Sequence, residues 1–107
     1  MYSRGNVYLV REGQTEGSEI QKTRPWILVG ANPLNRARST IIAVPLTTKQ
    51  REIPDLCIKV LLNNTACFAV LDQIRAVDKK RLIRQEGVIT DHELSEIEDG
   101  LRKILCL

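Results

Sequence analysis

The apolar residues of this chain come in short runs that are rich in β-branched side chains, and each run stops at a turn-forming or charged residue. Such runs are typical of strands, because they are too short to form helices of ordinary length. We therefore expect strands at 7–10, 26–30, 39–46, 56–62, 67–71, 72–78 and 85–89. Many short strands joined by turns favour a small, strongly bent antiparallel sheet or barrel.

The last part of the chain shows the only clear helical period. Thr90 and Glu93 have the spacing of a capping box, which marks the start of a helix. The apolar residues that follow recur every three or four positions and form one stripe: Leu94, Ile97, Leu101, Ile104 and Leu105. We predict an α+β fold in which this C-terminal helix packs on the bent sheet, as one domain over residues 1–107.

Three connecting segments complete the predicted fold. Residues 31–35 have the composition of a turn, and residues 79–83 that of a short helical turn. The polar stretch 11–23, which contains two glycines, is predicted to be a long loop. Pro45 lacks a backbone N–H group, so we expect it at a strand end or on an edge strand.

Composition limits the class of protein without deciding the function. The chain has 107 residues, of which 43% are hydrophobic, and a net charge of +3. That charge permits a nucleic-acid partner but does not require one. Three widely spaced cysteines argue against a disulfide framework and a zinc site and favour free thiols in a reducing cytoplasm. We expect a cytoplasmic protein without a membrane partner, because neither a signal peptide nor a spanning helix is present.

The candidate site residues lie where the polar segments meet the predicted strands. Arg24 directly precedes Pro25, which favours an extended backbone at the entrance of the second strand. An alternative is that Arg24 is a solvated cation paired with Glu19. Further polar residues are Thr47 and Thr48 after the third strand, and Asp72, Gln73 and Arg75 on the sixth. Trp26 is either a stacking platform for a base or part of the core or of a dimer interface.

The types of these residues favour phosphate chemistry in which the substrate supplies its own nucleophile. No Walker loop or metal-ligand spacing is present, and the single histidine, His92, falls on the predicted helix far from the polar loops. Arginine and hydroxyl groups are suited to holding phosphate oxygens. An RNA substrate would bring its 2′-hydroxyl, which the protein would only need to align with the phosphate.

Five segments, in order and in register, resemble the MazF/PemK family of toxins. They are Arg4-Gly5-Asn6-Val7-Tyr8, Gly17-Ser18-Glu19, Thr23-Arg24-Pro25, Pro45-Leu46-Thr47-Thr48 and residues 71–82, LDQIRAVDKKRL. The resemblance implies an SH3-like barrel and a homodimer that cleaves single-stranded RNA without a metal or cofactor. It also implies an antitoxin whose C-terminal segment occupies the RNA groove and with which the toxin binds DNA.

The resemblance assigns expected roles to individual residues. Arg24 would be the catalytic arginine and Thr47 its hydroxyl partner, with Glu19 as a base or as a residue that orients Arg24. RNA-binding residues would be Ser18, Thr48, Lys49, Asp72, Gln73 and Arg75. The expected products are a 2′,3′-cyclic phosphate and a 5′-hydroxyl.

The chain departs from the family pattern at several positions. Asn6 and Arg11 stand where acidic residues are common, and Ser18 and Val70 replace the histidine and arginine of the PemK branch. These departures favour a scheme based on Arg24 and Thr47. Two other functions stay open: a gyrase-binding toxin of the same fold, although the chain ends without an aromatic residue, and a non-catalytic nucleic-acid-binding module.

Overall fold

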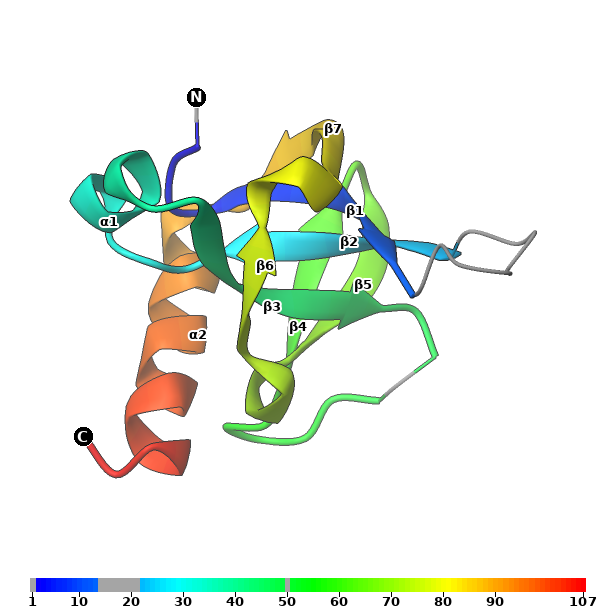
Figure 1. Ribbon diagram of the computed structural model, residues 1–107. Coiled ribbons are helices and arrows are strands. Elements are labelled where there is room, and N and C mark those ends of the chain that lie inside the picture. Colours follow the sequence, from blue (N-terminus) through cyan, green and yellow to red (C-terminus); the bar gives the residue numbers. More distant parts are fainter. Residues whose placement is uncertain (1, 14–21, 50) are drawn as a thin grey trace.

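The computed structural model describes residues 2–13, 22–49 and 51–107 (Figure 1). Within them the chain forms seven strands, two α-helices and two 3-10 turns. The strands are β1 (Asn6–Glu12), β2 (Lys22–Leu28), β3 (Thr40–Thr47), β4 (Cys57–Leu62), β5 (Thr65–Val70), β6 (Arg75–Asp78) and β7 (Leu82–Val88). The helices are α1 (Asn32–Ala37) and α2 (Asp91–Ile104), and the 3-10 turns are η1 (Leu71–Gln73) and η2 (Lys79–Arg81).

The strands form one antiparallel sheet in the order β4-β5-β3-β2-β1-β7, with β6 paired to β3. The sheet curls into a half-barrel, and α2 lies along one side of it (Figure 1). This arrangement confirms the predicted α+β fold, a strongly bent barrel-like sheet with a C-terminal helix. Asn63 and Asn64 form the turn between β4 and β5 with left-handed backbones, at φ values of 51° and 66°, as a type I′ hairpin turn requires.

Each face of the curled sheet carries a buried apolar cluster. Successive residues of a strand point to opposite faces. Val7 and Ile27 therefore join one buried cluster, which also contains Ile97 of α2. Tyr8 and Trp26 join a second cluster with Ile41, Ala43 and Val77 on the other face. A sheet with two apolar faces needs cover on both, and the curl and α2 supply it.

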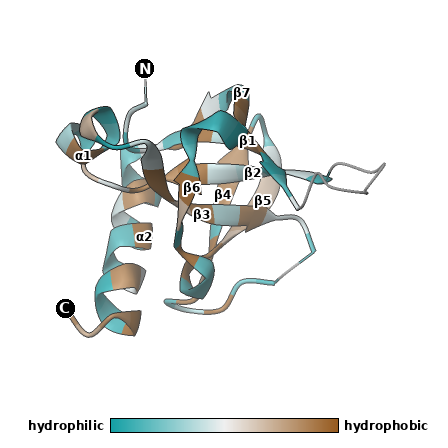
Figure 2. Ribbon diagram, in the orientation of Figure 1, coloured by the Kyte–Doolittle hydropathy of each residue, from teal (hydrophilic) through white to brown (hydrophobic). Residues whose placement is uncertain are grey.

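The capping box that begins α2 is confirmed, and it reaches beyond the helix. Thr90 Oγ1 accepts a hydrogen bond from Glu93 N at 3.1 Å, and Glu93 Oε1 accepts one from Thr90 N at 2.8 Å. The second carboxylate oxygen of Glu93 accepts from Leu61 N of β4 at 2.7 Å. The colours along α2 alternate between hydrophilic and hydrophobic (Figure 2), as in an amphipathic helix. An ion pair between Arg4 and Glu98 also holds α2.

Several predicted elements need correction. Residues 31–35 were predicted as a turn, but Asn32–Ala37 form α1, with Pro33 in the first turn where a proline costs no hydrogen bond. Asn35 of α1 is fully buried and donates to Gly30 O at 3.0 Å and to Tyr2 O at 3.5 Å. Arg4 N donates to Asn32 Oδ1 at 2.9 Å, so contacts with the distant N-terminal segment help to fix this short helix. The predicted strand 72–78 is split, because η1 takes its first two residues and β6 begins at Arg75.

Pro45 was predicted at a strand end or on an edge strand, but β3 lies inside the sheet. On one side β3 pairs with β2. On its other side it pairs with β6 up to Ala43 and with β5 from Leu46. Pro45 therefore lies between the residues of β3 that pair with β6 and those that pair with β5. Its missing N–H group interrupts neither the β3–β6 nor the β3–β5 ladder.

Candidate functional site

Arg24 lies inside a strand and not at the end of a loop. The structure extends β2 back to Lys22, which corrects both the predicted strand 26–30 and the predicted end of the polar loop. Arg24 pairs with Val10 of β1, and its side chain is 42% exposed. A rigid strand therefore carries the guanidinium to the surface.

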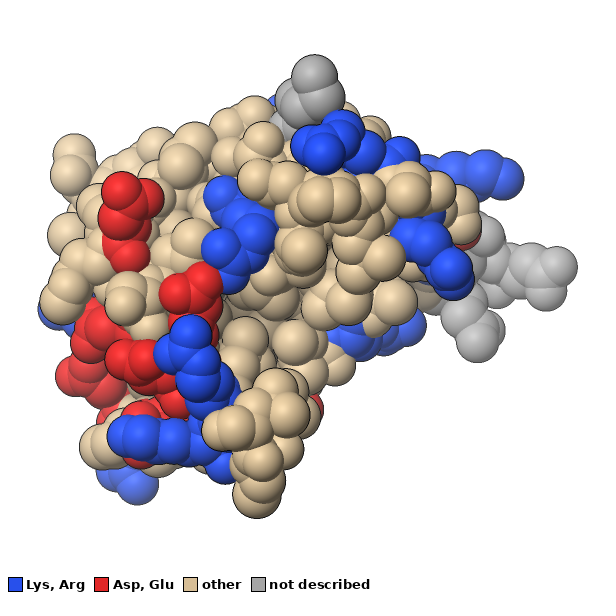
Figure 3. All heavy atoms as spheres, turned by 90° about the vertical axis from the view of Figure 1, so that its left-hand side faces the viewer, with Lys and Arg blue, Asp and Glu red and all other residues tan. Residues whose placement is uncertain are grey.

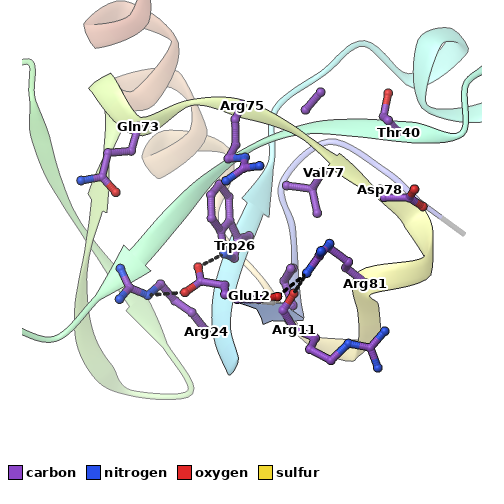
Figure 4. Close-up of a pocket in the computed structure, with 13 residues that line it drawn as sticks. Arg11, Glu12, Arg24, Trp26, Thr40, Gln73, Arg75, Val77, Asp78 and Arg81 are labelled. Atoms are coloured by element: carbon purple, nitrogen blue, oxygen red, sulfur yellow. Dashed lines mark hydrogen bonds and ion pairs between the residues drawn. The ribbon is translucent and has the colours of Figure 1, made fainter. Parts of the chain in front are cut away.

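Two pockets meet at Arg24. The larger has a volume of about 860 Å³ and is lined by Val10, Arg11, Glu12, Gly13, Arg24, Trp26, Thr40, Gln73, Arg75, Ala76, Val77, Asp78 and Arg81 (Figure 4). The smaller has a volume of about 210 Å³ and is lined by Thr23, Arg24, Pro25, Leu46, Thr47, Thr48, Lys49 and Cys67. Arg24 belongs to both, so a ligand that spans the two pockets must pass its guanidinium.

The register of the sheet explains why Arg24 and Thr47 line the same pocket. Trp26 of β2 is paired with Pro45 of β3. Continuing that antiparallel register by two residues brings Thr47 opposite Arg24. Thr47 is half-buried, and its Oγ1 accepts a hydrogen bond from Lys49 N at 3.2 Å, which orders the start of the following loop. Thr48 and Lys49 are exposed at the rim of the same small pocket.

The predicted RNA-binding residues of the segment 72–75 divide between two places. Gln73 of η1 and Arg75 of β6 line the larger pocket. Asp72 is exposed on η1 but does not line either of the two pockets among the described residues. Its carboxylate lies near Cys57, and this charge adds to the effect of burial in raising the pKa of the Cys57 thiol. Ser18 and Glu19 lie outside the described residues.

Two side chains of the larger pocket were missed by the sequence analysis. Glu12, at the end of β1, forms an ion pair with Arg24, with 3.4 Å between Arg24 Nε and Glu12 Oε1. Arg81 of η2 donates to the backbone oxygens of Arg11 and Gly13, at 3.1 and 3.0 Å. Strand alternation offers a signal for Glu12. Val10 and Glu12 of β1 lie on the same face of the sheet as Arg24 of β2, which pairs with Val10.

The charges around the site favour an anionic ligand. Four arginines line the larger pocket, Arg11, Arg24, Arg75 and Arg81, against two carboxylates. Many of the acidic residues lie elsewhere, because α2 alone carries Asp91, Glu93, Glu96, Glu98 and Asp99. Figure 3 shows acidic side chains gathered on the face of the molecule where α2 lies. A polyanion would therefore be attracted to the pocket side and repelled from α2.

Two further titratable side chains are Cys67, which is buried, and His92, which is exposed. Cys67 is buried at the wall of the smaller pocket, and burial raises the pKa of its thiol. His92 is exposed on α2, where its Nε2 lies 3.5 Å from Glu96 Oε1.

Among the described residues there is no group of three or more His, Cys, Asp or Glu side chains that could hold a metal ion. No helix in the described part of the chain is long and apolar enough to cross a membrane.

Comparison with known families agrees with this geometry. The model of the PemK-like, MazF-like toxins of type II toxin–antitoxin systems matches residues 3–105. The chain belongs to this family. The resemblance found in the sequence is thereby confirmed, and the match includes all seven strands and α2.

Individual relatives are similar over nearly their full lengths. Endoribonuclease MazF9 of Mycobacterium tuberculosis is 29% identical over 118 residues, which cover 100% of this chain and 98% of the relative. A solved mycobacterial endoribonuclease in complex with its cognate antitoxin is 27% identical, with a TM-score of 0.76 over 98% of this chain and 95% of that one. A MazE–MazF structure from Deinococcus radiodurans has a TM-score of 0.82 at 19% identity, over 98% of this chain and 96% of that one, and so shows the fold.

Proposed function

We propose that this chain is the toxin of a type II toxin–antitoxin pair and acts as an endoribonuclease on single-stranded RNA. The proposed reaction needs no metal, because the substrate supplies the nucleophile. The RNA 2′-hydroxyl gives up its proton to a base as its oxygen bonds to the adjacent phosphorus, the bond from phosphorus to the 5′-oxygen breaks, and the 5′-oxygen takes up a proton. The products are a 2′,3′-cyclic phosphate and a 5′-hydroxyl.

One observation carries the proposal: Arg24 and Thr47 line the same pocket. Negative charge grows on the phosphate oxygens as the 2′-oxygen attacks, and a guanidinium held in place stabilises this charge at no cost of reorganisation. The planar fork of donors on Arg24 suits two phosphate oxygens at once. The hydroxyl of Thr47 would donate to one of these phosphate oxygens and so fix the phosphate for in-line attack.

The two pockets on either side of Arg24 suggest how the protein holds the RNA strand. Sequence-specific recognition of RNA usually works on unpaired bases, whose edges are accessible. The side-chain amide of Gln73 and the guanidinium of Arg75 are suited to a base edge and a phosphate in the larger pocket. On the other side, we assign Thr48 and Lys49 to the neighbouring nucleotide. Asp72 and Ser18 also remain assigned to RNA binding.

The proton acceptor and the partners complete the proposal. We assign Glu19 the role of base or of a residue that orients Arg24, from the family pattern. The mycobacterial and Deinococcus relatives were solved with antitoxins, which supports a cognate antitoxin whose C-terminal segment covers the same pockets. We further propose a cytoplasmic homodimer that binds DNA together with that antitoxin.

A cleavage assay tests this function directly. Purified protein is incubated in chelator with labelled single-stranded RNA and with a copy that carries a 2′-deoxy substitution at the cut nucleotide. We expect cleavage of the RNA only, with comparable binding of both strands. Cleavage of the deoxy strand, or a requirement for added metal, would contradict the mechanism. Absence of any cleavage, with binding retained, would favour a non-catalytic module.

The role of Arg24 needs a matched control. Arg24→Ala should lower kcat by about 100- to 1,000-fold, the usual loss when one donor to a developing oxyanion is removed. Arg84→Ala makes the same chemical change on β7, where the side chain is 64% exposed and lines neither pocket. That variant should keep kcat within about twofold, since it removes charge without touching the reacting phosphate. Equal losses in both variants would place the active site elsewhere.

A further inference from the structure

Glu12 connects the exposed Arg24 to a buried tryptophan. Its Oε2 accepts a hydrogen bond from Trp26 Nε1 at 2.7 Å, and its Oε1 lies 3.4 Å from Arg24 Nε. Both carboxylate oxygens are therefore engaged. Figure 4 shows the three side chains in line, with the terminal nitrogens of Arg24 directed away from Glu12.

The tryptophan gives this carboxylate a fixed support. Trp26 is only 5% exposed and packs with Tyr8, Val10 and Leu28 in the second buried cluster. A ring in a close-packed cluster has little freedom to move. The indole N–H therefore holds one oxygen of Glu12 in place, and the second oxygen can restrict the rotation of an arginine side chain that is itself 42% exposed.

We propose that Glu12 is a positioning residue that holds Arg24 at the junction of the two pockets. By occupying the Nε side of the guanidinium, it leaves the two terminal nitrogens for the phosphate. An unrestrained arginine would sample several rotamers, and each misplaced rotamer loses the alignment on which the reaction depends. This inference rests on the proposed nuclease function. It also gives a reason for a carboxylate in a pocket that binds a polyanion.

A purely electrostatic role of Glu12 predicts the opposite result. If the carboxylate only repels RNA, its removal should strengthen RNA binding and raise kcat/KM, with kcat unchanged or higher. If it positions Arg24, its removal should lower kcat although the pocket becomes more positive. The KM should stay equal or fall in either case, so the change in kcat decides between them.

The test uses Glu12→Gln, which keeps the size of the side chain and an oxygen that can accept from Trp26, but removes the charge that attracts Arg24. We expect kcat on single-stranded RNA to fall by about 10- to 100-fold, in the range found for small misplacements of a reacting group. Glu12→Ala, which removes both contacts, should lose at least as much. An unchanged or higher kcat in Glu12→Gln would overturn the proposal.

Glu86→Gln is the matched control. The Glu86 side chain is 28% exposed, against 25% for Glu12, and it also forms an ion pair with an arginine, at 3.6 Å from Arg84. It lines neither pocket among the described residues. Both variants change the net charge equally, so a general effect of charge on RNA binding appears in both. Equal loss of kcat in the two variants would also overturn the proposal.

Two spectroscopic measurements do not depend on cleavage. The Nε–H resonance of Arg24 in an NMR spectrum should shift in Glu12→Gln and stay in place in Glu86→Gln. Trp26 is the single tryptophan of the chain, so its fluorescence should change in Glu12→Ala, which removes the acceptor of its N–H group. If wild type does not cleave RNA but these shifts occur, the contact exists and the proposed function fails. If wild type cleaves RNA and the resonance is unmoved, the positioning role fails.

Discussion

Gly100→Ala is a sensitive test of how α2 is packed against the part of the chain that carries Gln73. Gly100 is buried in α2, and a methyl group added there would overlap Leu71 Cδ1 and lie 3.0 Å from the carbonyl oxygen of Asp55. Leu71 begins η1, which ends at Gln73 in the larger pocket. Glycine at this position therefore allows a close approach between helix and backbone.

The expected loss of stability follows from two opposing terms. Alanine is favoured over glycine within a helix by about 1 kcal/mol. Inserting a methyl group into a packed interior costs about 1–3 kcal/mol. The backbone oxygen of Asp55 cannot move aside as a flexible side chain can, so the cost lies in the upper part of that range. The free energy of unfolding should fall by about 1–2 kcal/mol, which lowers Tm by about 4–8 °C in a domain of this size.

Thermal and denaturant unfolding measure this effect, with two further variants for comparison. Ser95→Ala changes an exposed position of the same helix and should raise stability slightly, because alanine favours the helix and nothing opposes it. Leu71→Val removes the Cδ1 methyl group, so Gly100→Ala should cost less in that background. If Gly100→Ala is as stable as wild type or more stable, the close packing of α2 on η1 is refuted.

Two other predictions concern the start of α2 and the buried thiols. Thr90→Ala should lower the free energy of unfolding by about 1 kcal/mol, while Thr90→Ser should be nearly neutral, because only the first loses the acceptor for Glu93 N. Burial raises the pKa of Cys57, Cys67 and Tyr8, so the folded chain keeps protons that the unfolded chain releases. Stability should therefore fall as the pH rises past 9.0, the ordinary thiol value. Denaturant unfolding at pH 7 and pH 10 checks this, and equal stability would contradict it.

Local signals in the sequence were sufficient for elements with a local cause. The capping box predicts the start of α2, because both of its hydrogen bonds join residues three positions apart. The Asn63-Asn64 pair predicts the β4–β5 turn, because asparagine tolerates the left-handed backbone that the turn needs. In contrast, α1 has only six residues and no apolar period. It is held by contacts with the N-terminal segment, where Arg4 N donates to Asn32 Oδ1 and the buried Asn35 donates to Tyr2 O, and no window of sequence displays these contacts.

The site divides in the same way between local and distant causes. Arg24 and Thr47 were candidates from their residue types and their positions beside predicted strands, and the resemblance to a family assigned their roles. Their shared pocket follows from a register that the sequence does not state. Glu12 is hidden in the polar stretch that precedes Arg24, since composition makes residues 11–23 look like one loop. In the structure both ends of that stretch are strand, and β1 pairs with β2 so that Glu12 lies diagonally across from Arg24. A contact of this kind depends on register, and one residue of slip would send Glu12 to the opposite face of the sheet. Polar stretches next to short strands should therefore be tested as extensions of a hairpin before they are treated as loops, because the residues that orient a catalytic group can lie within them.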